Sequence, residues 1–390
     1  MKSFARPETG ALSRISLIIG AVFLALSVIG FFVDKNQFFF SYQVAFTFWL
    51  SIGLGGLFLT LLHHVFGATW SIVLRRIMET IMSVLPWMVL FFLPMLLGLH
   101  ELFHWTHSDA VAHDPLLQQK QPYLNVPFFI IRAVIYFSVW IYLARWFYKK
   151  SVDQDKEYDH KQAHRLRQVA APAIILFALT LTFAAFDWMM SLDPHWYSTI
   201  YGVYYFAGST LATISILIIF TRTIQAKGGM KNVLNLDHYH DMGKMLFTFV
   251  VFWAYIAFSQ YFLIWYANIP EETLYYFHRW EGNWKTISLI IVFGKFVIPF
   301  LILITRSSKR NLTFLTTISL WLLLMQWLDL YWMIMPTLHP HSTHFSWLDV
   351  TTLLGIGGVF VGLFFNKVQK QEIVPVNDPK LPQSLEFTTH

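Results

Sequence analysis

Cysteine is absent from the 390 residues, and charged residues are scarce, at 13% of the chain. Without cysteine, the chain can hold no cysteine-ligated iron–sulfur cluster, no covalently attached c-type haem, no thiolate nucleophile and no disulfide. A water-soluble domain usually carries about 25% charged residues. This chain therefore lacks the polar residues that a water-facing surface needs.

Hydrophobic residues make up 56% of the chain and aromatic residues 18%, including 38 Phe and 16 Trp. Such a composition suits contact with lipid and anchoring at the membrane interface. A helix needs roughly 20 apolar residues to cross the hydrocarbon core, and the sequence contains ten such stretches. The fold class predicted is an all-α polytopic membrane protein. The predicted spans are about 13–33, 42–66, 80–104, 125–148, 169–191, 199–224, 244–268, 283–305, 312–335 and 347–367.

The basic residues alternate between the two sides of these spans. Of 28 Lys and Arg residues, 22 lie in the segments or at the span ends on one side, four lie on the other side (Lys35, Lys120, Arg279 and Lys285), and Arg132 and Lys295 lie inside spans. By the positive-inside rule both termini are cytoplasmic, and the net charge of +6 needs no nucleic-acid partner. We expect one transmembrane domain over 1–371, with 372–390 a cytoplasmic tail that lies on a partner or stays mobile.

Ionisable side chains lie within or next to the predicted spans, where charges are costly and usually either functional or paired. Groups near both faces could form proton half-channels. Each group also has a structural interpretation: Arg132 could pair with Asp187 or Asp329, and Lys295 with a carboxylate or a backbone carbonyl. The proton-path candidates are Lys295, Asp329, Asp187, Arg132, Glu101, His100, His63, His64, Glu79 and Tyr204.

The stretch from His100 to His104 fits the pattern H-E-x-x-H, which on a helix can bind zinc. The extended form of this motif fails, because His107 stands at its glycine and Ala110 at its third histidine. A b-type haem needs two histidines at equal depth on facing helices, and neither His63 nor His64 has a partner inside another span. No catalytic, cofactor-binding or metal residue is therefore predicted.

The block FAAFDWMMSLDPHWYSTIYGVYYFAGS, residues 183–209, together with LGLHELFHWTH and WLDLYWMIMP, resembles the F subunit of alternative complex III. That complex is a bacterial quinol:cytochrome c or electron-carrier oxidoreductase, and the subunit is similar to polysulfide-reductase-like (NrfD-like) membrane subunits. The resemblance covers nearly the whole chain. It implies two four-helix bundles, spans two to five and six to nine, flanked by spans one and ten.

The resemblance also implies a cofactor-free subunit in the bacterial inner membrane that acts as a scaffold and candidate proton conductor. Implied partners are the related C membrane subunit, an iron–sulfur subunit and c-type cytochrome subunits, with a terminal cytochrome oxidase as a further contact. Iron–sulfur clusters and haem c would lie in those partners, menaquinol or ubiquinol would be the substrate of the complex, and phospholipids would be bound.

Two other functions stay open at this stage. The chain could bind quinol directly, with His100, Glu101 and Asp187 accepting its protons. It could also be a stand-alone secondary transporter, although such folds usually show inverted repeats and broken helices, and neither is clear in the sequence. The glycine-rich stretches 53–56 and 355–358 predict close helix packing.

Overall fold

The computed structural model describes residue 4 and residues 6–157 and 159–389, and all regular structure among these residues is helical. Within this part of the chain, ten helices or helix groups are long and apolar enough to cross a membrane. They are α1 (Gly10–Val33), α2 (Lys35–Phe66), α3 (Ile72–Met82) with α4 (Leu85–Leu97), α8 (Val126–Asp153), α9 (His160–Trp188), α10 (Tyr201–Ala226), α11 (Leu236–Ala267), α13 (Trp284–Ile291) with the π-helical segment η3 (Val292–Val297) and α14 (Ile298–Leu303), α16 (Leu312–Ile334) and α17 (Trp347–Val368).

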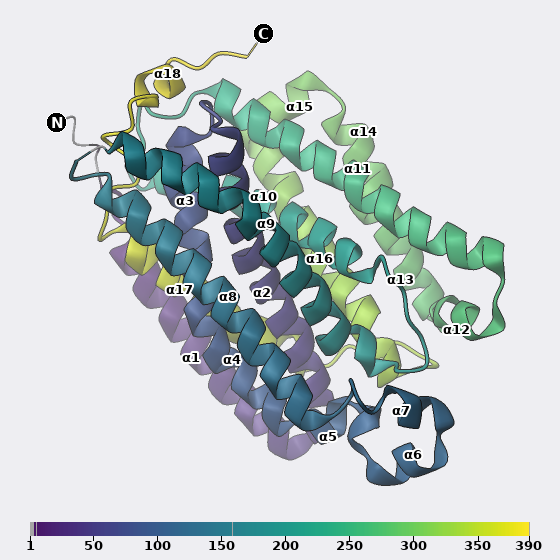
Figure 1. Ribbon diagram of the computed structural model, residues 1–390. Coiled ribbons are helices and arrows are strands. Elements are labelled where there is room, and N and C mark those ends of the chain that lie inside the picture. The colour runs from purple at the N-terminus through teal and green to yellow at the C-terminus, as the bar shows by residue number, and fades with distance from the viewer. Residues whose placement is uncertain (1–3, 5, 158, 390) are drawn as a thin grey trace.

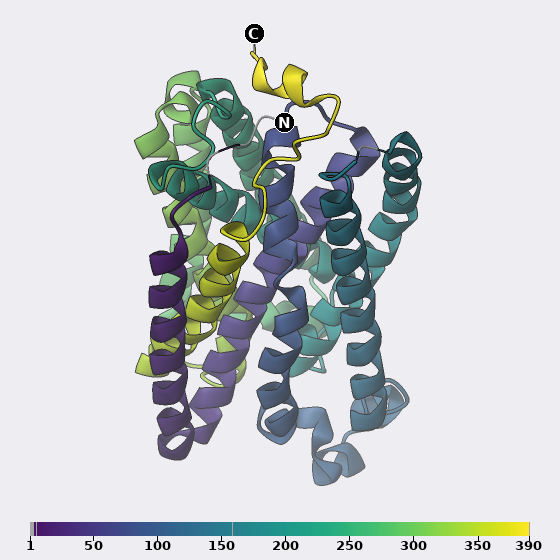
Figure 2. The ribbon, with the colours of Figure 1, turned by 90° about the vertical axis from the view of Figure 1, so that its left-hand side faces the viewer.

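Short helices fill the connections between these long ones. The helices run up and down, and both chain ends lie at the same end of the molecule (Figures 1 and 2). We call this the termini end, and the opposite one, which carries α5–α7 and α12, the far end. The short helices are α5 (Leu99–Leu102), η1 (His104–Thr106), α6 (Ser108–His113), α7 (Pro115–Lys120), η2 (Met190–Leu192), α12 (Pro270–His278), α15 (Arg306–Arg310), η4 (Met335–Thr337) and α18 (Leu381–Leu385).

The centre of the molecule is formed by α2 and α10, which pack against each other and against most of the other long helices. The apolar windows of these two helices are 89% and 83% buried, whereas that of α1 is only 22% buried. Glycine permits the close approach, because a Cβ built on Gly55 would lie 2.0 Å from Thr213 Oγ1. The predicted packing role of this glycine-rich stretch is confirmed. At the second stretch, a Cβ on Gly358 would meet the backbone of Gly20 in α1 at 2.4 Å.

Polar caps set several helix boundaries. The Asn125 side chain accepts from the N–H of Phe128 at the start of α8, and capping boxes begin α11 at Asn235 and α17 at Ser346. Such caps satisfy backbone donors that the first helical turn leaves free. They explain why α11 begins at Leu236 rather than at the predicted residue 244, where the apolar run starts.

The predicted span 80–104 is wrong at both ends. The helix begins at Ile72, because Arg75 and Arg76 are buried in α3 and paired with carboxylates rather than exposed in a loop. It ends at Leu97, and Phe103 is extended, with φ −115°. Span two likewise begins at Lys35 rather than at 42. Its apolar run continues back through buried phenylalanines to the cap at Asp34.

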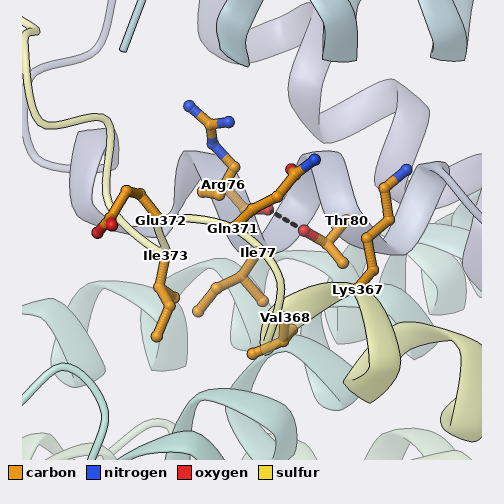
Figure 3. Close-up of a pocket in the computed structure, with 8 residues that line it drawn as sticks. All are labelled: Arg76, Ile77, Thr80, Lys367, Val368, Gln371, Glu372 and Ile373. Atoms are coloured by element: carbon orange, nitrogen blue, oxygen red, sulfur yellow. Dashed lines mark hydrogen bonds between the residues drawn. The ribbon is translucent and has the colours of Figure 1, made fainter. Parts of the chain in front are cut away.

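The described part of the tail, residues 372–389, differs from the expectation that the tail rests on a partner or stays mobile. It folds across the termini end of the chain itself, where Ile373 and Val374 are buried and Ser384 Oγ donates to the carbonyl of Trp70. Figure 3 shows how its first residues lie over Arg76 and Ile77 of α3. Buried apolar side chains and polar contacts such as the ion pair of Asp378 with Arg75 hold it there, which the low apolar content of the segment did not suggest.

Candidate functional site

The first buried cluster of charges centres on Lys295, in the π-helical segment η3. Lys295 is 0% exposed, and its Nζ lies 2.5 Å from Asp329 Oδ2 and 2.5 Å from Gln326 Oε1. The other oxygen of Asp329 accepts from the Tyr204 hydroxyl at 2.5 Å, and Trp253 Nε1 donates to Asp329 Oδ2 at 3.1 Å. A buried pair is stable only when its remaining hydrogen-bonding positions are satisfied. Side chains from α10, α11, η3 and α16 satisfy them here.

The backbone at Lys295 departs from a regular α-helix. Residues Val292–Val297 form a π-helix between α13 and α14, and the carbonyl of Gly294 accepts from Trp321 Nε1 at 2.7 Å. A π-helical insertion costs hydrogen-bond geometry and is found disproportionately at functional sites. The distortion and the buried lysine therefore coincide in one segment of the helix.

The second cluster joins Arg132 of α8 to Asp187 of α9. The guanidinium is bidentate, with Nε 2.7 Å from Oδ2 and Nη2 2.9 Å from Oδ1 of Asp187. Tyr136 donates to the same carboxylate at 2.8 Å, and the Arg132 guanidinium lies 3.9 Å from the centre of the Tyr123 ring. The sequence left Asp187 and Asp329 open as partners of Arg132, and the structure shows Asp187. Lys295 pairs with a carboxylate, that of Asp329.

The third cluster lies toward the termini end around Glu79, which is fully buried in α3. Its carboxylate oxygens lie 3.5 Å from Arg75 Nε, 3.3 Å from Arg76 Nε and 4.0 Å from His64 Nε2. Within the described chain, neither oxygen makes a hydrogen bond of normal geometry, and the same holds for His64 Nε2. Buried polar atoms are costly when they stay unpaired, so this cluster differs in kind from the two ion pairs.

The remaining contacts of this third cluster hold its arginines in place. Arg75 Nη1 lies 2.7 Å from Asp378 of the tail, and Arg76 Nη2 lies 2.8 Å from Asp155. Burial raises the pKa of Asp155, and the charges of the two arginines oppose that shift. The Nδ1 of His63 lies 2.7 Å from Ser71 Oγ.

The remaining two candidates, His100 and Glu101, lie outside the buried clusters. They belong to the short helix α5, beyond the end of the span, and Glu101 forms an ion pair with Lys35. The His100 ring is exposed and lies 3.7 Å from the ring of His107, centre to centre. Because Phe103 interrupts the helix, His100 and His104 do not share one helical face, and the spacing argument for zinc does not apply.

The direct quinol interpretation needs free carboxylates at the far end. Both carboxylates that it names are engaged in the structure, Asp187 by Arg132 and Tyr136, and Glu101 by Lys35. A quinol proton would have to displace one of these partners. The geometry therefore gives this interpretation little support.

Several residues of the clusters were missed in the sequence, among them Gln326, Trp253 and Tyr136. Single polar or aromatic residues in apolar helices carry no pattern of their own. Arg75 and Arg76 were counted as loop charges, yet the spacing R-R-x-x-E places both arginines within one helical turn of Glu79. That spacing was the available signal for the third cluster.

Comparison with known proteins adds no family: no family model matches the chain, and no curated protein shows significant similarity to it.

Proposed function

We propose that this chain is a cofactor-free integral membrane subunit of a respiratory quinol:electron-acceptor oxidoreductase of the alternative complex III type. In this role it scaffolds the complex and carries candidate proton half-channels. The support is the resemblance of residues 183–209, together with ten apolar helices and an absence of cysteine. The iron–sulfur and haem c centres, the related C subunit and the quinol site belong to its partners.

The packing of the long helices supports the two-bundle arrangement that the resemblance implies. Contacts run within the set α2, α3–α4, α8 and α9 and within the set α10, α11, α13–α14 and α16, and the two sets also meet, chiefly through α2 and α10. Helix α1 lies along α17, which packs on α2. The chain ends and the connection that contains α15 lie at the termini end (Figure 1), and these segments carry many of the basic residues. This end is then the cytoplasmic one, which makes the far end periplasmic in a bacterial inner membrane.

The observation that carries the proton-conduction part is the Lys295 network in the second bundle. Lys295 is the twelfth residue of a 20-residue span, which puts it about 16 Å along the helix axis from the far end. A lysine at that depth is rare unless a charge is used there. Glu79 and His64 add a separate polar cluster nearer the cytoplasmic end. Its buried atoms that make no hydrogen bond within the described chain, the two Glu79 oxygens and His64 Nε2, suit ordered water.

Affinity purification through this subunit in a mild detergent tests the proposal. The eluate is examined by optical redox spectroscopy and by mass spectrometry of every chain that comes with it. Haem c bands together with an iron–sulfur subunit are the expected result. A colourless protein that stays alone in several detergents would overturn the proposal, because a scaffold subunit has no function by itself.

A stand-alone secondary transporter is the second candidate, and one observation favours it. The structure contains helix interruptions that the sequence did not reveal: the π-helical segment at Lys295 and the break between α3 and α4 at Ser83 and Val84. Transporters often bind ions at such discontinuous helices. The same purification separates the two functions, since a transporter would be isolated without redox subunits.

A further inference from the structure

An open groove lies at the termini end between α4, the last turns of α8 and the end of α17. It encloses about 650 Å³ and is lined by two kinds of side chain. Cations form one part, contributed by Arg145, Lys149 and Lys367, and apolar or aromatic side chains form the other, among them Trp87, Leu90 and Tyr148. The packing of α4 against α8 is sparse compared with that of α2 against α10, which leaves room for the groove.

The three cations have no anionic partner in the described chain. None of them forms an ion pair within 4.0 Å, whereas the neighbouring Arg75 and Arg76 are both paired with carboxylates. Lys367 also lines the pocket under the tail, where Figure 3 shows it on the opposite side from Glu372. The groove therefore presents three cations without an ion pair among the described residues, and the Lys367 ammonium lies 3.7 Å from the centre of the Tyr148 ring.

The positions of the side chains on their helices give the groove a polar and an apolar part. Arg145, Tyr148 and Lys149 are spaced i, i+3 and i+4, so they share one face of α8. Trp87 and Leu90 share one face of α4 and are 48% and 56% exposed. Basic pockets between membrane helices on the cytoplasmic side bind anionic lipid headgroups, and tryptophan is enriched at that level.

We propose that this groove binds one anionic phospholipid. Its phosphate lies among Arg145, Lys149 and Lys367, and an acyl chain runs along Trp87 and Leu90. The apolar part selects a lipid over free phosphate, because inorganic phosphate makes no use of the exposed Trp87 and Leu90 surface. The inference rests on the proposed function for the side of the membrane, and it gives the bound phospholipid that the resemblance implies a site of stated chemistry.

Native mass spectrometry of the full-length chain, in the assembly with which it purifies, tests the site. The delipidated protein is titrated with phosphatidylglycerol, with phosphatidylcholine of the same acyl chains, and with inorganic phosphate. We expect phosphatidylglycerol to bind most tightly. The triple variant R145Q/K149Q/K367Q should bind it at least about 10-fold more weakly, because each basic residue near a membrane surface attracts an anionic lipid measurably.

The matched control is R165Q/R167Q, which removes two exposed charges at the same end of the molecule but outside the groove. It should bind phosphatidylglycerol like the wild type. The single variant R145Q, whose side chain is exposed, keeps the test decisive if the triple variant does not assemble, and about a 5-fold loss is expected. The proposal would be overturned by equal binding of the two lipids or by stronger binding of inorganic phosphate than of lipid. It would also be overturned if R165Q/R167Q lost as much affinity as the triple variant, or if R145Q lost none.

Discussion

Two buried ion pairs occupy matching places in the order of the chain and differ in their chemistry. In each, the cation lies on one long helix and the aspartate on the next: Arg132 and Asp187, then Lys295 and Asp329. A proline follows each aspartate by seven residues, and a 3-10 turn begins within that interval. The two halves of the molecule therefore repeat one arrangement of charges.

The difference lies in depth and in the identity of the cation. Arg132 is the seventh residue of α8, about 9 Å along the axis from the helix start, whereas Lys295 lies nearly twice as deep in a distorted helix. A guanidinium is always protonated and binds a carboxylate in a rigid fork, whereas a buried lysine can release its proton. The same arrangement is therefore a rigid, permanently charged pair in the first half, and in the second half it contains a cation that can lose its proton.

The largest effect is expected from breaking the Arg132–Asp187 pair. R132M leaves Asp187 buried with only Tyr136 to stabilise its charge, and removing one partner of a buried pair costs about 3–5 kcal/mol. The variant should fail to assemble or should melt far below the wild type, as measured by the yield of purified complex and by its thermal unfolding. R132K is the control that retains the charge and loses the bidentate geometry of the guanidinium. Its melting temperature should fall between those of R132M and the wild type. A wild-type melting temperature for R132M would contradict the stabilising role of this pair.

A smaller effect on stability and a larger one on function are expected in the second half. The double variant K295M/D329N removes both charges together, which avoids an unpaired buried charge. It should assemble and transfer electrons, but translocate fewer protons per electron in reconstituted vesicles. The matched variant R132M/D187N should assemble and keep the wild-type proton yield.

Two outcomes of that pair of variants would break the comparison. An unchanged proton yield in assembled K295M/D329N would reduce Lys295 to a structural role like that of Arg132. An equal loss of proton yield in both double variants would mean that the charges do not differ in function, only in depth.

The ten long apolar helices were largely predictable because the apolar length of a span follows from the thickness of the bilayer. All ten predicted spans overlap a helix in the described residues. Their ends were less predictable, since caps such as Asn235 and buried charges such as Arg75 extend helices beyond the apolar run. Hydropathy does not record these interactions.

The candidate site was predictable in part. Charged residues in apolar helices identified Arg132, Asp187, Lys295 and Asp329, but the choice of partner depended on how the helices pack, which no single-sequence pattern determines. The π-helical segment at Lys295 also has no marker in the sequence. The seven-residue spacing from aspartate to proline was present twice in the sequence. It indicates a repeated arrangement only once the structure shows that the helices of Asp187 and Asp329 correspond.

The smallest effect is expected at an exposed pair that extends the comparison to the surface. His195 follows the helix of Asp187, and its Nε2 lies 2.5 Å from Asp114 Oδ2 at the far end. This hydrogen bond lowers the pKa of Asp114. A carboxylate with a lowered pKa adds stability above its unfolded pKa of about 3.9, and that stability is lost as the pH falls through the folded pKa.

H195A should therefore lower the melting temperature slightly near neutral pH, and the difference from the wild type should vanish once the pH falls below the lowered pKa of Asp114. H113A is the matched control, because His113 contacts only the backbone carbonyl of Asp109, and its melting temperature should follow the wild type at every pH. Exposed ion pairs contribute little compared with buried ones. A decrease in melting temperature in H195A as large as that in R132M would show that burial does not explain why the Arg132–Asp187 pair contributes more stability than a surface pair.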